Sequence, residues 1–274
     1  MTDTILAPPR AEAGARPLQG SNVWYELMTP DPDAATSFYG AVVGWSIGEP
    51  IGGDQDYRMI GRSDGGFAGG VLKINDEMQS HGARPIWLGY IGVDDVDATV
   101  AAIEARGGKT LMPAFDIPQG RIAMVADPQG APFYVMKPIP PAEKLDAQSD
   151  VFSPTEQQRV SWNELSTNDP AAARKFYTEL FGWDDGEFMD MGPMGEYRFL
   201  DHGGTRIGAL CGVMPGAQPK WRYYIRVPSI ATAQQAAEAN GGTIHMGPHQ
   251  VPTGDYIIIG SDPQGAEFAL VGGQ

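Results

Sequence analysis

Apolar and polar residues alternate over short stretches of the chain, and these stretches are separated by segments with helical spacing. Residues 23–28 alternate strictly and predict a strand. Asp31-Pro32 is a helix-start signal, so we expect a helix from Ala34 to Val43 that ends at Gly44. Glycine-rich turns then separate three short predicted strands, near residues 45–49, 57–62 and 67–73.

The same order of elements then starts again. A strand is predicted at 86–93, followed by a helix from about Asp95 to Arg106 that stops at Gly107-Gly108. Three more short strands are predicted near residues 109–112, 121–126 and 131–137. This part of the chain therefore contains two successive βαβββ modules.

The whole arrangement is repeated in the second half of the chain. The segment VWYELMTPDPDAATSFYGAVVGW from Val23 corresponds to VSWNELSTNDPAAARKFYTELFGW from Val160. Later, DPQGAPFYV from Asp127 corresponds to DPQGAEFAL from Asp262. An internal repeat of this length predicts two tandem domains, and hence four modules.

The composition between the repeats suggests the domain limits. Residues 1–20 are rich in Pro, Ala and Gly and are expected to form a loose tail. A proline-rich linker is expected at 139–157, because its composition breaks any regular pattern. The two domains are then expected at residues 21–138 and 158–274.

The motifs just quoted carry a family resemblance. An aromatic first strand, then TPD or TND, FY and GW, and a later DPQG turn, resembles the vicinal oxygen chelate superfamily of glyoxalases, bleomycin resistance proteins and dioxygenases. More narrowly, the chain is similar to two-domain, glyoxalase-like proteins of actinobacteria. The resemblance covers about residues 22–271 and implies an α+β fold of tandem glyoxalase-like domains. In each domain, two βαβββ modules should form a half-open, curved sheet around a ligand cavity.

Superfamily members generally hold one divalent metal ion, and the resemblance assigns its ligands to six positions of this chain. These positions are Trp24, Leu88 and Tyr134 in the first copy and Trp162, Arg222 and Ala269 in the second. None of them is a carboxylate, imidazole or thiolate, and Arg222 would repel a cation. The four histidines have no counterparts between the copies and are expected on the surface or in loops. We therefore expect neither a metal nor another cofactor.

Strand alternation predicts which side chains face each cavity. The expected lining of the first cavity is Trp24, Glu26, Met28, Tyr57, Leu88, Tyr90 and Tyr134. The expected lining of the second is Trp162, Glu164, Ser166, Tyr197, Arg222, Tyr224 and Arg226. Aromatic walls with a few polar groups are typical of small-molecule pockets and suit a flat ligand. The arginines of the second cavity would favour an anionic ligand there.

Glu26 and Glu164 are the candidate catalytic residues. A carboxylate surrounded by Trp, Met and Tyr side chains should have a raised pKa through desolvation, and could act as a general acid or base without metal. Alternatively, each glutamate caps a backbone amide or pairs with a nearby arginine. Duplication alone would place a glutamate in both copies, so the repetition does not decide between these roles.

Three functional hypotheses follow. The first is a metal-independent protein that binds an aromatic or conjugated metabolite, drug or cofactor. The second is a metal-free lyase, isomerase or hydroxylase that uses Glu26 or Glu164 for acid–base chemistry. The third is a structural or interaction unit whose cavities are filled by its own side chains.

Charge and cysteine content limit the partners. The formal net charge of -15 would be repelled by nucleic acid and by anionic membranes. The N-terminus has no apolar core typical of a signal peptide, so a cytoplasmic location is the default expectation. Cys211 is the single cysteine, so an intrachain disulfide is impossible; aligned with Val71, it is expected to be a small buried hydrophobe. A monomer or homodimer is compatible with the sequence.

Overall fold

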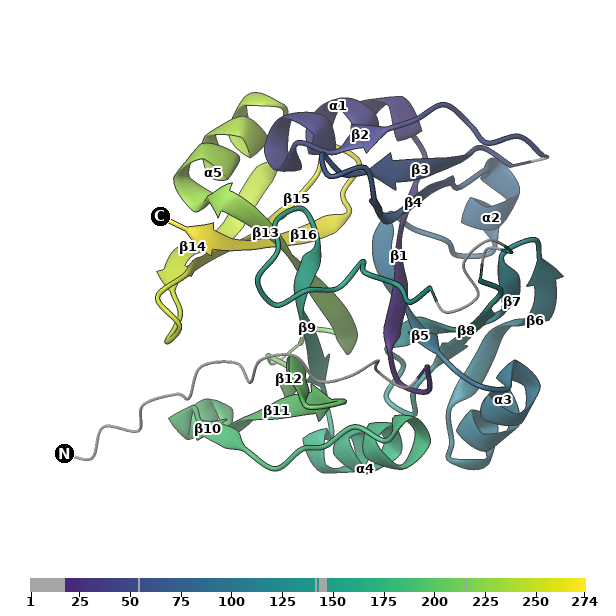
Figure 1. Ribbon diagram of the computed structural model, residues 1–274. Helices are drawn as coiled ribbons and strands as arrows, with labels where there is room; N and C mark the ends of the chain where they lie inside the picture. Colours follow the sequence, from purple (N-terminus) through teal and green to yellow (C-terminus); the bar gives the residue numbers. More distant parts are fainter. Residues whose placement is uncertain (1–17, 54, 141, 143–146, 215) are drawn as a thin grey trace.

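The computed structural model describes residues 18–274 except 54, 141, 143–146 and 215 (Figure 1). Of the expected N-terminal tail, residues 1–17 lie outside the described residues. The described chain forms two mixed sheets with helices packed against them, one sheet for each copy of the repeat.

Each copy contains the two expected βαβββ modules in sequence order. The first copy consists of β1 (Asn22–Thr29), α1 (Pro32–Val43), β2 (Ser46–Ile47), β3 (Tyr57–Gly61), β4 (Phe67–Lys73), α2 (Asp76–Ser80), β5 (Ile86–Gly92), α3 (Val96–Ala105), β6 (Lys109–Ile117), β7 (Gly120–Ala126) and β8 (Pro132–Pro138). The second copy consists of β9 (Val160–Thr167), α4 (Pro170–Phe181), β10 (Phe188–Asp190), the 3-10 helix η1 (Gly192–Met194), β11 (Glu196–His202), β12 (Thr205–Gly212), β13 (Lys220–Ser229), α5 (Ile230–Ala239), β14 (Thr243–Gln250), β15 (Tyr256–Ser261) and β16 (Glu267–Gly273).

The two modules of each copy join within one 8-stranded sheet. The strand order is β2-β3-β4-β1-β5-β8-β7-β6 in the first sheet and β10-β11-β12-β9-β13-β16-β15-β14 in the second. β1 pairs antiparallel with β5 and parallel with β4, and β9 makes the equivalent pairs. Among the described strands neither sheet closes into a barrel, which confirms the predicted α+β fold of two tandem half-open sheets.

The helix-start signals act as expected from the sequence. Asp31 accepts a hydrogen bond from the backbone N–H of Ala34 at 3.0 Å, and Asp95 accepts one from Ala98 at 2.9 Å. These carboxylates satisfy amide groups that have no partner inside the helix. Helix α1 ends at Gly44, whose φ of 80° is the left-handed conformation that glycine adopts without steric cost.

Neither helix α2 nor the 3-10 helix η1 was predicted from the sequence. Helix α2 lies in the connection between β4 and β5, where Asn75 accepts a hydrogen bond from the N–H of Met78 at 2.8 Å. The equivalent connection, between β12 and β13, is shorter and forms no helix in its described part. The two copies therefore differ in what covers this end of the sheet.

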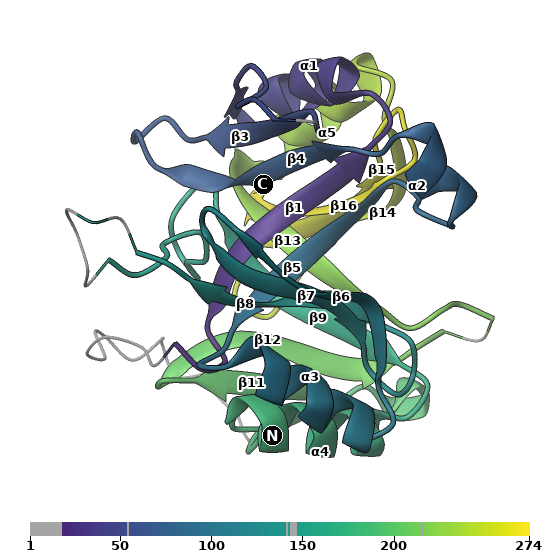
Figure 2. The same ribbon diagram turned by 90° about the vertical axis from the view of Figure 1, so that its right-hand side faces the viewer.

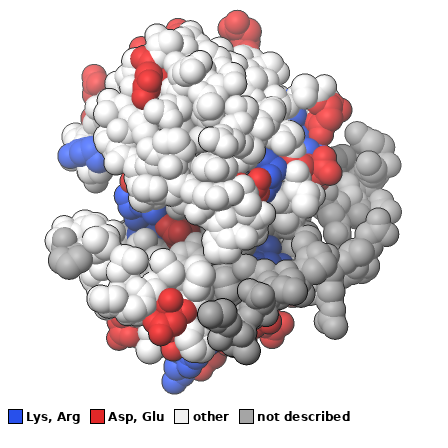
Figure 3. Space-filling model, turned by 90° about the vertical axis from the view of Figure 1, so that its left-hand side faces the viewer, with Lys and Arg blue, Asp and Glu red and all other residues white. Residues whose placement is uncertain are grey.

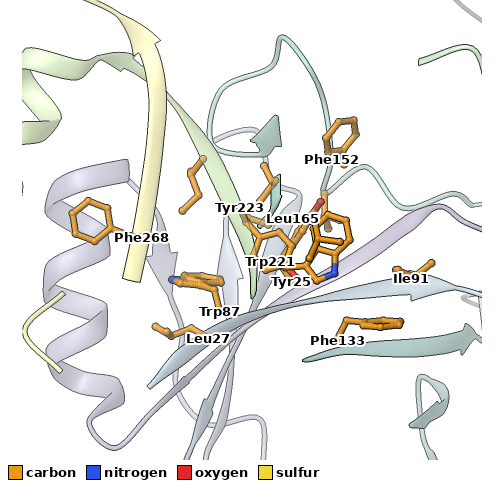
Figure 4. Packing of buried hydrophobic residues seen from close by; sticks show 14 of the residues in the cluster. Tyr25, Leu27, Trp87, Ile91, Phe133, Phe152, Leu165, Trp221, Tyr223 and Phe268 are labelled. Carbon is orange, nitrogen blue, oxygen red and sulfur yellow. The ribbon is translucent and has the colours of Figure 1, made fainter. Parts of the chain in front are cut away.

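The two sheets pack back to back around one shared hydrophobic core (Figure 4). Helix α1 of the first copy lies beside α5 of the second, and α3 lies beside α4 at the opposite end of the molecule (Figure 1). Phe38 on α1 contacts Phe268 on β16, with ring centroids 5.4 Å apart. At the other end of the molecule Phe133 on β8, the counterpart of Phe268, contacts Tyr177 on α4, with ring centroids 5.7 Å apart. Each module therefore packs against the module of the other kind in the other copy.

A buried hydrogen-bond network crosses this interface. The Tyr39 hydroxyl donates to Asp262 at 3.1 Å and accepts from the indole N–H of Trp87 at 2.9 Å. Asp262 belongs to the DPQG turn, where its other oxygen accepts from the amide of Ala266. The matching network of the other copy consists of Tyr177, Asp127 and Trp221. The FY motif and the DPQG turn are thus partners across the interface.

A close approach of two strands explains one glycine in each copy. A Cβ atom on Gly69 would lie 2.1 Å from the carbonyl oxygen of Tyr25, and one on Gly208 would lie 1.9 Å from that of Asn163. No side chain fits at such distances. Within the described part of the chain, no helix is long and apolar enough to cross a membrane.

Candidate ligand-binding site

Figure 2 turns the strands of the first sheet toward the viewer. The outer face of this sheet, opposite the shared core, carries a separate hydrophobic cluster. We call this face the first bowl; its members include Trp24, Met28, Leu88, Tyr90 and Tyr134. Tyr25 and Leu27, which alternate with them on β1, point into the shared core instead. The structure therefore brings together on one face the side chains that strand alternation assigned to one cavity.

Aromatic side chains and Glu26 form a polar chain inside the first bowl. The indole N–H of Trp24 donates to the Tyr57 hydroxyl at 2.8 Å, and the Tyr90 hydroxyl donates to Glu26 at 2.9 Å. The ring of Tyr134 stacks on that of Tyr90, with centroids 4.2 Å apart and planes 11° apart. Two tyrosine rings thus cover the carboxyl group.

Burial makes Glu26 an unusual carboxyl group. The residue is 3% exposed, and its Oε1 has no hydrogen-bond partner among the described residues. Burial raises the pKa of Glu26 to about 7, although the Tyr90 hydroxyl and the nearby Tyr57 hydroxyl act to lower it. Glu26 can therefore hold or release a proton near neutral pH.

The first bowl is largely filled by its own side chains. The apolar residues Met28 on β1, Leu72 on β4 and Leu88 on β5 are all buried. Helix α2 contributes Met78, which packs against the same cluster. Buried methionine and tyrosine side chains therefore fill this face.

The outer face of the second sheet has the same series of hydrogen bonds between Trp, Tyr and Glu side chains, but its glutamate has other partners. We call this face the second bowl; its apolar cluster contains Trp162, Tyr224, Met246, Ile257, Ile259, Ala269 and Val271. The Trp162 indole donates to the Tyr197 hydroxyl at 2.8 Å, and Tyr197 donates to Glu164 at 2.8 Å. On this side of the molecule, basic and acidic side chains meet in a hollow between two lobes (Figure 3).

Arginines in the second copy are paired with carboxylates. Arg222 donates to Glu164 at 2.6 Å and to Glu267 at 2.8 Å, and Lys220 binds Glu267 as well. Arg226 pairs with Asp255 at 2.8 Å. These ion pairs remove the reason for expecting an anionic ligand, because the guanidinium charges are already compensated.

The two candidate glutamates therefore have different surroundings. Glu164 has the arginine partner that the alternative interpretation required, whereas the described partners of Glu26 are tyrosines. Ser166 was also expected in the second cavity. Its hydroxyl oxygen lies 3.9 Å from the sulfur of Cys211.

The assignment of Cys211 as a buried counterpart of Val71 is wrong by one residue. Cys211 pairs with Ser166 in the register of β12 and β9, as Leu72 pairs with Met28 in the first copy. A shift of one residue moves a side chain to the other face of a sheet, so the half-buried Cys211 belongs to the second bowl. Aligning Gly69 with Gly208 would have given the correct register. Burial raises the pKa of the Cys211 thiol to about 11, which keeps it protonated.

The residues present do not fit a divalent metal ion. Nowhere in the described residues do three His, Cys, Asp or Glu side chains group so as to hold one. Glu164 and Glu267 are the carboxylates of the second bowl, and both bind Arg222. Of the histidines, His202 is buried on β11, contrary to the expectation that all four lie at the surface or in loops.

Comparison with known proteins gives a consistent family assignment. The model of the Glyoxalase/Bleomycin resistance protein/Dioxygenase superfamily matches residues 23–135 and 159–270. CFP32 of Mycobacterium tuberculosis, whose name assigns it provisionally to the glyoxylases, is 33% identical over 92% of this chain and 95% of its own length. The anthracycline biosynthesis protein DnrV of Streptomyces peucetius is 29% identical over 92% of this chain and 93% of its own.

The fold is also shared with solved structures. The Mn(II)-bound glyoxalase from Novosphingobium aromaticivorans superimposes with a TM-score of 0.60 and 17% identity, covering 93% of this chain and 82% of that one. At this identity the likeness concerns the fold alone.

Proposed function

The chain belongs to the Glyoxalase/Bleomycin resistance protein/Dioxygenase superfamily, and from this premise we propose that it is a metal-independent binding protein for a small aromatic or conjugated molecule. The observation that carries the proposal is the make-up of the second bowl. Aromatic rings there surround a compact set of hydrogen-bonding groups, and the carboxylates are held by Arg222 instead of being available to a cation.

Two further points support this function. The name of the relative DnrV places that protein in the biosynthesis of a small molecule, and this chain covers nearly all of it. Trp162, Tyr197 and Tyr224 place aromatic rings around Glu164, with their polar hydrogens donated to Tyr197 or to Glu164 itself. Aromatic walls of this kind suit a flat ligand.

Native mass spectrometry combined with metal analysis tests the proposal. We expect no stoichiometric metal in the purified protein, and a carried or screened small molecule that raises the unfolding midpoint after treatment with EDTA. Ligand binding that disappears in EDTA and returns with one equivalent of a divalent metal ion would contradict metal independence.

Proton transfer by Glu26 is the second candidate function, and its pKa of about 7 is the observation that favours it. Glu26 is buried, so a substrate would reach its carboxyl group only after the side chains around it move. Glu26→Gln should abolish conversion of the bound molecule, followed by mass spectrometry, and should leave its binding intact. Unchanged conversion in this variant would eliminate the role.

A further inference from the structure

The shared core is asymmetric where β5 of the first copy contacts β13 of the second. Tyr25 and Tyr223 meet there, with ring centroids 5.2 Å apart (Figure 4). Gly89 pairs in register with Tyr25, and Tyr223 pairs in the same way with Asn163. Tyr25 and Asn163 are counterparts in the repeat, so Gly89 and Tyr223 are counterparts as well. At both equivalent positions the two copies therefore carry different residues.

Each of these tyrosines contacts its own counterpart in the other copy. The Tyr25 hydroxyl donates to Oδ1 of Asn163 at 2.8 Å, and Nδ2 of that side chain donates to the carbonyl oxygen of Ile207 at 2.7 Å. The backbone N–H of Gly89 donates to the Tyr223 hydroxyl at 2.8 Å. Twice, and in opposite directions, a large residue of one copy thus faces the smaller residue at the equivalent position of the other.

The contact leaves no room for a further ring. A Cβ atom on Gly89 would lie 2.8 Å from Cε1 of the Tyr223 ring. The cavity at this contact measures about 10 Å³, which is space for about one water molecule. Nearby in the core, Trp87 and its counterpart Trp221 are identical. The sizes of the differing residues are therefore matched across the interface.

Two inner faces of the same kind would not match in this way. Two first-copy faces would bring Tyr25 against a second Tyr25, in the space that a ring and an amide now share. They would also bring Gly89 against a second Gly89, which leaves the volume of a ring empty. Two second-copy faces would crowd Tyr223 against itself and leave a gap between the asparagines. Both overfilling and an empty cavity destabilise a core.

From these observations we propose that Tyr25, Gly89, Asn163 and Tyr223 make the inner face of each copy specific for the inner face of the other copy. We call these four residues the pairing set. The partner that fits the first copy is the second copy, and the pairing set excludes contact between like copies of two chains. This inference does not depend on the proposed binding function.

Urea unfolding of the full chain tests the pairing set. Asn163→Tyr/Tyr223→Gly gives the second copy the residues of the first, and Tyr25→Asn/Gly89→Tyr does the reverse. Each double variant then contains two like faces, and its unfolding equilibrium constant should rise by about 100-fold or more. The variant with all four substitutions exchanges the residues and restores the match. It should be more stable than either double variant, by about tenfold or more in the same constant.

The non-additivity is the decisive result. A variant with all four substitutions that is no more stable than the double variants would overturn the proposal. The matched control exchanges Met28 and Ser166, which are counterparts on the two outward faces. The effects of Met28→Ser and Ser166→Met should simply add, because these side chains do not meet across the core.

A milder pair of substitutions keeps the test decisive if the double variants do not fold. Gly89→Ala places a methyl group against the Tyr223 ring and should raise the unfolding equilibrium constant about tenfold in the wild-type background. In the Tyr223→Ala background the ring is gone, so the same substitution should have little effect. Equal effects of Gly89→Ala in the two backgrounds would overturn the proposed matching of sizes.

Discussion

Replacement of Glu26 by Gln should make the protein more stable at alkaline pH. The burial of Glu26 raises its pKa from an ordinary value of 4.5 to about 7. Between these two values the unfolded chain releases the proton while the folded chain keeps it, so stability falls as the pH rises through this window. The difference corresponds to about 3 kcal/mol of lost stability above pH 7. Glutamine cannot ionise and removes this loss.

Urea unfolding at a series of pH values between 4.5 and 8.5 measures the effect. The free energy of unfolding of Glu26→Gln should exceed that of the wild type by about 2–3 kcal/mol at pH 8 and approach a constant offset near pH 4.5. The constant offset at low pH reports how well the glutamine amide fits in place of the carboxyl group. The decisive quantity is therefore how the difference in unfolding free energy between Glu26→Gln and the wild type changes with pH. The matched control is Glu164→Gln, which deprives Arg222 of a partner and should lower stability by about 1–3 kcal/mol at pH 8. A difference between Glu26→Gln and wild type that does not vary with pH would refute the reasoning.

Further variants test the interface and the close strand contact. Tyr39→Phe should lower the free energy of unfolding by about 1–3 kcal/mol, because Asp262 and Trp87 each lose a buried hydrogen-bond partner; a loss within the error of the urea titration would show that water replaces the hydroxyl. Gly208→Ala should destabilise by about 2 kcal/mol or more, since its Cβ would lie 1.9 Å from a carbonyl oxygen of β9. Gly186→Ala is the control for that variant, because nothing lies within 4 Å of the added methyl group, and thermal unfolding of the two variants side by side should separate them clearly.

Periodicity and the repeat were sufficient to predict the strands, the main helices and the facing of β1. Alternation along residues 23–28 separates Trp24 from Tyr25, and the structure places them on opposite faces as predicted. The same pattern contains no information about which surfaces of the two copies meet, since any apolar face can pack against another. The back-to-back arrangement and the contact between Tyr39 and Asp262 were therefore not predictable from it.

Side-chain partners were harder to predict than elements. Arg222 was correctly expected near Glu164, but the second carboxylate, Glu267, was missed. It lies two residues before Ala269 on β16, so strand alternation would have placed it on the same face. The desolvation of Glu26 was foreseen from its aromatic and aliphatic neighbours. Its extent follows from how completely the carboxyl group is buried, which strand alternation alone does not give.

The back-to-back packing has a consequence for how such a duplicated protein can diverge. Some residues of the shared core are the same in both copies, as in Tyr39 and Tyr177 or Asp127 and Asp262, whereas Tyr25 donates a hydrogen bond across the core to its own counterpart, Asn163. On the outward faces the Trp–Tyr pair and the glutamate are kept in both copies, whereas Tyr134 has an alanine as its counterpart. Mutations can therefore change the outward face of one copy while the shared core keeps the molecule folded. One copy can then specialise while the other mainly provides structural support.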